Sequence, residues 1–162
     1  MIQRLQTLYL LIVFILCIVS LCSTIAGFNA GGEEVACFGN FGFHSFSEPF
    51  TNIDTSGPWA LGVLLIVIAL LSLYTIIMFH KRVLQMRLTV FNIVLLVGYI
   101  LLYALYVWIY QQKLGEVESS LEVGFQMKLT AIYPLVSIIL CILAFRGIRK
   151  DEKLVRSLER IR

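Results

Sequence analysis

The sequence predicts an all-α membrane protein, a bundle of four transmembrane helices with both termini in the cytoplasm. Apolar residues make up 59% of the 162 residues and charged residues 14%, which leaves no room for a separate soluble domain. Four uncharged apolar runs each approach the ~20 residues that a helix needs to cross ~30 Å of hydrocarbon. They cover residues 7–27, 59–79, 88–112 and 129–145. Residues 1–162 are therefore expected to form a single membrane domain.

The basic residues set the expected orientation. Eleven of the thirteen Lys and Arg residues fall at Arg4, in the connector 80–87 and in the tail 146–162. Only Lys113 and Lys128 lie on the opposite side, in the second outer loop 113–128. Because cytoplasmic loops of membrane proteins carry an excess of Lys and Arg, both termini are expected inside.

The first run is expected to be a transmembrane helix and not a signal peptide, since it exceeds the apolar core of about 7 to 15 residues found in signal peptides. The first outer loop, residues 28–58, then contains five phenylalanines within thirteen residues, from Phe38 to Phe50. Two short aromatic runs, 35–38 and 41–46, flank Gly39-Asn40, a permissible two-residue hairpin turn. The alternative is an irregular loop whose phenylalanines lie against the headgroup region.

The connector 80–87 is so short that the second and third runs are expected to form an antiparallel helical hairpin. The second outer loop is expected to be a short surface segment with at most one helical turn.

In the third run, Asn92 is expected either to hydrogen-bond a neighbouring helix or to reach the interface. No Asp, Glu, Lys or Arg lies near the middle of any run, which argues against a proton relay or an ion-coupled carrier.

Four tyrosines recur along one face of the third run at spacings of four, three and four: Tyr99, Tyr103, Tyr106 and Tyr110. This tyrosine seam either packs within the bundle or lines a groove for a lipid headgroup or a partner helix. Pro134 in the fourth run is expected to kink its helix, with Ser137 able to satisfy a freed carbonyl.

The sequence contains no motif for catalysis, for a cofactor or for a metal, and the protein is expected not to be an enzyme. Cys17, Cys22 and Cys141 lie within the runs. Cys37 stands alone in an outer loop, so it is expected to be a thiol or to be bonded to another chain.

The tail 146–162 carries seven basic and three acidic residues, and its apolar residues recur at helical spacing. It is expected to form an amphipathic cytoplasmic helix that continues from the fourth run. Such a helix either lies on anionic lipid or docks a protein; the mixed charges favour docking.

The opening MIQRLQTLYL (1–10) and the closing RKDEKLVRSLERIR (149–162) resemble a family of small uncharacterised four-span inner-membrane proteins of Bacteroidota. The resemblance implies a bacterial inner (cytoplasmic) membrane location and this fold, and it supplies no substrate, cofactor or catalytic residue. The plan of four spans with a larger first outer loop is also similar to that of claudins, whose paired loop cysteines this chain lacks.

The preferred hypothesis is a non-catalytic accessory or scaffold subunit of an envelope membrane complex. Its partners are expected to be the lipid bilayer and other membrane proteins of that complex. Binding of nucleic acid is not expected, and the sequence identifies no small-molecule substrate. The residues expected to bind partners are Gln3, Arg4, Lys153, Leu154, Arg156, Leu158, Arg160 and Ile161 on the inner side and Phe41, Phe43 and Phe46 on the outer side. The alternative is a small-molecule or lipid transporter that uses the tyrosine seam and Pro134.

Overall fold

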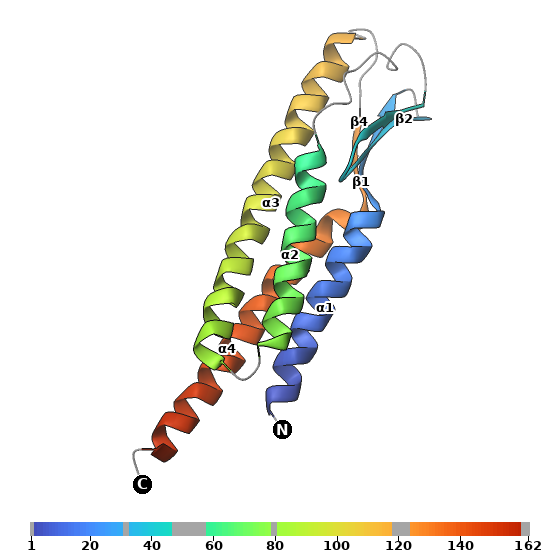
Figure 1. Cartoon of the computed structure of the whole chain (residues 1–162). Helices are drawn as coiled ribbons and strands as arrows, with labels where there is room; N and C mark the ends of the chain where they lie inside the picture. The colour runs from blue at the N-terminus through green and yellow to red at the C-terminus, as the bar shows by residue number, and fades with distance from the viewer. Residues whose placement is uncertain (1, 31–32, 47–57, 79–80, 118–123, 160–162) are drawn as a thin grey trace.

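The computed structural model describes residues 2–30, 33–46, 58–78, 81–117 and 124–159. Its long helices are α1 (Ile2–Cys22), α2 (Trp59–Ile77), α3 (Arg82–Val117) and α4 (Tyr133–Glu159), and a short 3-10 turn, η2 (Leu129–Ile132), leads into α4. In the described part of the chain, four helices are long and apolar enough to cross a membrane. The predicted four helices are therefore confirmed (Figure 1).

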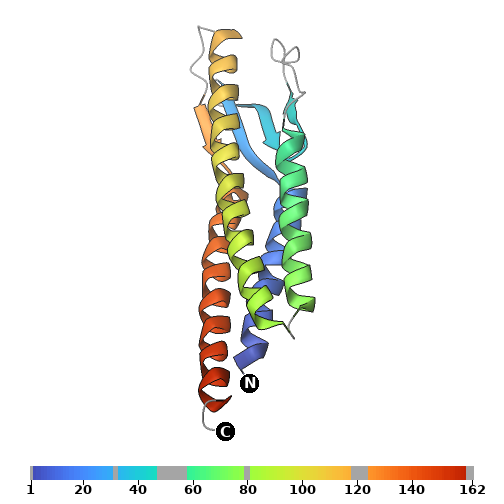
Figure 2. The same ribbon diagram turned by 60° about the vertical axis from the view of Figure 1, so that its left-hand side comes forward.

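The four helices pack as a ring in which α1 and α3 each contact both α2 and α4 (Figure 2). Residues 78 and 81 bracket the link between α2 and α3, which form the predicted antiparallel hairpin. Inward positions recur at spacings of three and four, the repeat by which neighbouring helices interlock in bundles. They are Gln6, Leu10, Val13, Cys17 and Ser20 in α1; Gln85, Thr89, Asn92, Leu96 and Tyr99 in α3; and Pro134, Ser137, Cys141, Ala144, Ile148 and Asp151 in α4.

A small antiparallel sheet lies at the end of the bundle opposite the two termini (Figure 1). Its strands, in spatial order, are β3 (Phe43–Ser45), β2 (Glu33–Gly39), β1 (Thr24–Ala30) and β4 (Gly124–Met127). We call this end of the molecule the sheet end and the other the termini end. The predicted β-hairpin is confirmed as β2 and β3, and the sheet is larger than predicted because β1 and β4 extend it.

Two predicted boundaries are corrected by this sheet. Helix α1 ends at Cys22, where Ser23 bonds back to the carbonyls of Val19 and Ser20, and not at residue 27. The apolar residues that follow pair as β1 with β2 on one side and with β4 on the other. In the second outer loop, α3 continues to Val117 and β4 follows, in place of a single helical turn. The periodicity of a short apolar segment does not show whether it is the end of a helix or a buried strand.

The hairpin turn is also one residue later than predicted. Phe38 pairs with Phe43, and the Gly39 amide donates to the Gly42 carbonyl at 2.9 Å, so Asn40-Phe41 forms the turn. This register places Phe43 opposite Phe38 on the buried side, whereas Phe41 lies in the turn and is 58% exposed.

The prediction that the tail continues the fourth helix is confirmed by α4, which runs without a break from Tyr133 to Glu159. Its last turns project beyond the start of α1 at the termini end (Figure 1). Pro134 is the second residue of α4 and follows the 3-10 turn, so the described helix begins around it instead of kinking there. Ser137 does donate a hydrogen bond to the Tyr133 carbonyl, at 2.9 Å.

Candidate functional site

The tyrosine seam lies under the sheet. Phe38 of β2 packs against Tyr103, Tyr106 and Tyr110, with ring centroids 6.3, 6.4 and 5.5 Å apart. Phe43 of β3 stacks on Tyr110 at 4.8 Å with the ring planes only 3° apart. The sheet thus occupies the face of α3 that an open groove would need. Aromatic pairs of this kind contribute about 0.5–1.5 kcal/mol beyond the area that they bury.

The hairpin turn is inserted among three helices at the sheet end. The Asn40 side chain donates to the Ser20 carbonyl of α1 at 2.6 Å and accepts from the Tyr99 hydroxyl of α3 at 2.7 Å. Its backbone carbonyl accepts from the Gly62 amide of α2 at 3.0 Å. Asn40 and Tyr99 are each 1% exposed. We call this set of bonds the Asn40 junction; it joins the first outer loop to the bundle.

A second set of polar side chains lies inside the bundle toward the termini end. Gln6 of α1 donates to a carboxylate oxygen of Asp151 in α4 at 2.6 Å, and both residues are buried. Gly147 lets the two helices approach, since a Cβ at that position would lie 3.0 Å from Gln6 Cγ. The Ser72 hydroxyl of α2 donates to the Leu10 carbonyl at 2.9 Å. These contacts tie α1 to α4 and to α2.

Asn92 lies in the bundle interior. It is 0% exposed, which excludes the interface position, and neither its amide nitrogen nor its amide oxygen has a hydrogen-bond partner among the described residues. The bond to a neighbouring helix that its position suggested is therefore not formed within the described part of the chain. A buried polar group without a partner costs about 1–3 kcal/mol, so Asn92 lowers the stability of the bundle.

Asn92→Leu is therefore expected to stabilise the folded protein by about 1–2 kcal/mol, because leucine has the same branching at Cγ and needs no hydrogen bond. The measurement is the midpoint of unfolding as SDS is added to the protein in mild detergent. Asn92→Asp, which retains the shape and adds polarity, is the matched control and is expected to lower the midpoint. A lower midpoint for Asn92→Leu would contradict the assignment.

The structure divides the predicted outer partner residues. Phe41 and Phe46 are 58% and 65% exposed, whereas Phe43 is 1% exposed and packs on Phe28 and Tyr110. Phe43 therefore belongs to the core and not to an exposed surface, because the strand register turns it inward. Cys37 is also buried in β2, so its thiol is not on the surface.

The predicted inner partner residues lie at the two chain ends. Gln3 and Arg4 are in the first turns of α1, and four others continue the backbone of α4: Lys153, Leu154, Arg156 and Leu158. Their side chains lie outside the described part of the structure, as do Arg160 and Ile161 altogether. Sequence reasoning missed Gln6, Asn40 and Asp151. The spacing of Ser137, Cys141, Ala144, Ile148 and Asp151 could have indicated that Asp151 faces the bundle.

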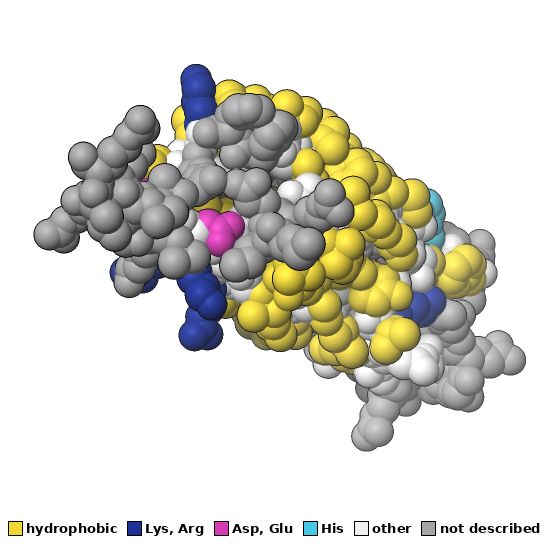
Figure 3. Space-filling view, turned by 90° about the horizontal axis from the view of Figure 1, so that it is seen from below, with side chains coloured by type: hydrophobic (Ala, Val, Ile, Leu, Met, Phe, Trp, Pro, Cys, Tyr) yellow, Lys and Arg dark blue, Asp and Glu magenta, His cyan; other side chains and the backbone are white. Residues whose placement is uncertain are grey.

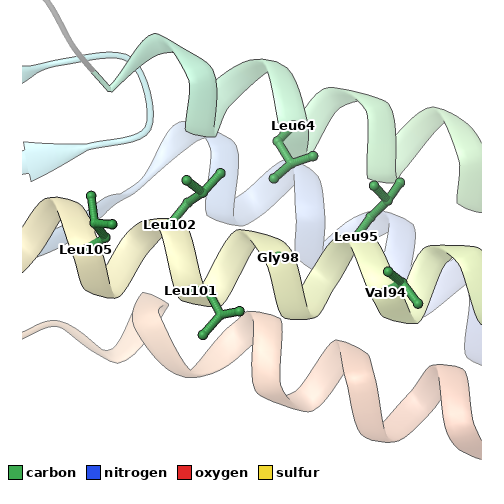
Figure 4. Close-up of a pocket in the computed structure, with 7 residues that line it drawn as sticks. All are labelled: Leu64, Val94, Leu95, Gly98, Leu101, Leu102 and Leu105. Carbon is green, nitrogen blue, oxygen red and sulfur yellow. The ribbon is translucent and has the colours of Figure 1, made fainter.

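Two of the grooves on the outer surface of the described helices involve α3. One, of about 460 Å³, is apolar and runs between α2 and α3 beside Gly98 (Figure 4). Leu95 and Leu102 point toward α2 on either side of Gly98, across from Leu64 (Figure 4). The other, of about 420 Å³, lies between α3 and α4 near the termini end, and we call it the basic groove. It is lined by Val83, Met86, Arg87, Val90, Phe145, Arg149 and Glu152.

Fold and site together define a class of protein: a bundle of four helices, each long and apolar enough to cross a membrane, with a four-stranded sheet that closes one end. Residues 2–161 match the model of the family described as "Domain of unknown function (DUF4293)". The chain belongs to this family. No curated protein matches the chain.

Proposed function

We propose that this protein is a non-catalytic accessory or scaffold subunit of a bacterial envelope membrane complex. In this proposal it spans the inner membrane four times, with the termini end in the cytoplasm and the sheet end outside. The sorting of eleven of thirteen basic residues to one side supports that orientation. The termini end would dock a cytoplasmic or membrane partner, and the sheet end an outer one.

One observation carries the proposal: α4 leaves the bundle as a continuous helix whose direction is set by buried contacts. Ile148 and Asp151 are 1% and 8% exposed, and Asp151 bonds to Gln6. The backbone then continues as helix to Glu159. A helix held in this way presents the segment from Lys153 onward in one direction, and ordering the segment before binding reduces the entropy cost of docking.

The surface at the termini end fits the same role. Seen from this end, Lys and Arg side chains project at the edge of a surface on which apolar and acidic side chains are also visible (Figure 3). Lys81, Arg87, Arg146, Arg149 and Lys150 are exposed here. Such a rim would position the bundle against anionic headgroups and leave the helix end to a protein partner.

The sheet end offers a smaller exposed aromatic surface beside α2. Phe41 and Phe46 are exposed, and Trp59 at the start of α2 is 64% exposed. The Phe41 ring lies next to Gly62 of α2, which places the hairpin turn against that helix. Aromatic side chains are enriched where membrane proteins meet the interface and where they meet partners.

The transporter alternative loses its main support. It needed the tyrosine seam as a groove, and the seam is covered by Phe38 and Phe43 of the sheet. It also needed a kink at Pro134, which lies at the start of α4. Uptake by reconstituted vesicles that is lost on changing Tyr103 and Tyr106 to Phe would revive this alternative.

Deleting Leu154 to Arg162 is expected to leave the bundle inserted and to reduce the recovery of its companion proteins to about a tenth or less, since helices dock through a few apolar anchors. The measurement is gentle affinity purification from membranes, followed by mass spectrometry of what is retained. Changing Leu154, Leu158 and Ile161 together to Ser is expected to have the same effect.

The matched control changes Ser157 to Ala and Glu159 to Gln, two tail residues outside the set expected to bind partners. This variant is expected to retain its companions. Identical companions with and without residues 154–162 would contradict the docking role. A tail that responds to salt and to lipid headgroups while every companion is retained would lie on lipid instead.

A further inference from the structure

The basic groove combines two chemistries in one place. Its apolar lining consists of Val83, Met86 and Val90 from α3 and Phe145 from α4. Its charged lining consists of Arg87, Arg149 and Glu152, so two positive charges face one negative charge. Both arginines are exposed, and they come from different helices.

The position of these groups along the chain matches a membrane surface. Arg87 immediately precedes the uncharged run 88–112, and Arg149 lies four residues beyond the uncharged run 129–145. The charged side chains therefore lie at the level where the apolar stretches of α3 and α4 end, and Val90 and Phe145 lie within those stretches. Helix pairs with basic side chains at this level are suited to bind anionic lipid headgroups.

The dimensions and donors fit a phospholipid better than a bare anion. A groove of about 420 Å³ exceeds the space that a phosphate group alone would fill, and much of its lining is hydrocarbon. Arginine can donate two parallel hydrogen bonds to a phosphate. Arg87 on α3 and Arg149 on α4 could therefore bind the same phosphate group. An acyl chain would cover the apolar lining that is otherwise exposed between α3 and α4.

We propose that the basic groove binds an anionic glycerophospholipid, with Arg87 and Arg149 contacting the headgroup phosphate and one acyl chain lying along Val90 and Phe145. This site is separate from the docking segment beyond Glu152 and does not depend on it. A lipid in the basic groove would contact both α3 and α4, and it would therefore stabilise the packing of these two helices.

The test measures lipid binding to the full chain in a zwitterionic detergent by native mass spectrometry. Phosphatidylglycerol and phosphatidylcholine with the same acyl chains are titrated separately. The wild-type protein is expected to bind phosphatidylglycerol at least about tenfold more tightly than phosphatidylcholine. Arg87→Gln with Arg149→Gln is expected to abolish this preference, and each single variant to reduce it in part.

The matched control is Lys113→Gln with Lys128→Gln, which removes the same charge from two lysines of the sheet end that do not line the groove. It is expected to keep the preference. Phe145→Ala is expected to weaken binding of both lipids, and excess inorganic phosphate is expected not to compete. Equal loss in the control, or full competition by phosphate, would overturn the proposal. The thermal unfolding midpoint in detergent without added lipid verifies that each variant is folded.

Discussion

Asn40→Ala is expected to destabilise the folded protein by about 3 kcal/mol, because it leaves a buried hydroxyl without its acceptor and removes the side-chain bond between the hairpin turn and α1. The Tyr99 hydroxyl loses its acceptor and the Ser20 carbonyl loses its side-chain donor. Tyr99 is 1% exposed, so water cannot easily replace the lost bond. The hairpin turn would then be held to the bundle mainly by the bond between the Gly62 amide and the residue 40 carbonyl.

The measurement is the midpoint of unfolding in SDS and mild detergent, together with protease cleavage of the first outer loop. Tyr99→Phe is the control, since it removes one hydrogen bond and is expected to cost about 1 kcal/mol. The double variant is expected to lose less than the sum of the two, because both changes remove the same bond. Additive losses would mean that the Asn40–Tyr99 bond contributes nothing.

Gly62→Ala is expected to destabilise the protein by about 2 kcal/mol through overpacking. A Cβ at this position would lie 2.6 Å from an atom of the Phe41 ring and 3.0 Å from the Asn40 carbonyl oxygen. The exposed ring can swing aside. The carbonyl cannot move as easily, because the Gly62 amide bonds to it and the Asn40 side chain is held by two further bonds.

Gly98→Ala is the matched control for this prediction. A Cβ at Gly98 would have no atom within 4 Å, because it would enter the apolar groove between α2 and α3. The unfolding midpoint is expected to be unchanged or raised, since alanine favours a helix over glycine by up to about 1 kcal/mol. If the two variants unfold at the same midpoint, the close approach of the hairpin turn to α2 does not contribute to stability.

The helices were predictable because a membrane permits few alternatives. In hydrocarbon a chain must satisfy its backbone groups internally, and ~20 apolar residues do so as one helix. The short link between α2 and α3 required antiparallel neighbours, as observed. The exception was the end of α1, because the chain from Thr24 onward forms strand β1 and does not continue the helix.

The inward faces were harder to predict because the helices are apolar on nearly all sides. No apolar face can then be distinguished from a polar one. The polar residues indicate the inward face instead: Gln85, Thr89 and Asn92 recur at spacings of four and three, and all are buried. Polar groups avoid lipid, so in such helices they indicate the interior. Asp151 follows the same rule, although its neighbours in sequence suggested a solvated tail.

The sequence by itself determined the number of long apolar helices, their order along the chain, the sorting of charge and the continuation of α4, because these depend on local composition and chain length. Only the tertiary structure decided that the tyrosine seam is covered, that Phe43 is buried while Phe41 is exposed, and that Asn40 joins three helices. Each of these depends on strand register and on contacts between residues far apart in the chain, for example the 59 positions between Asn40 and Tyr99. Local propensity carries no information about such pairings.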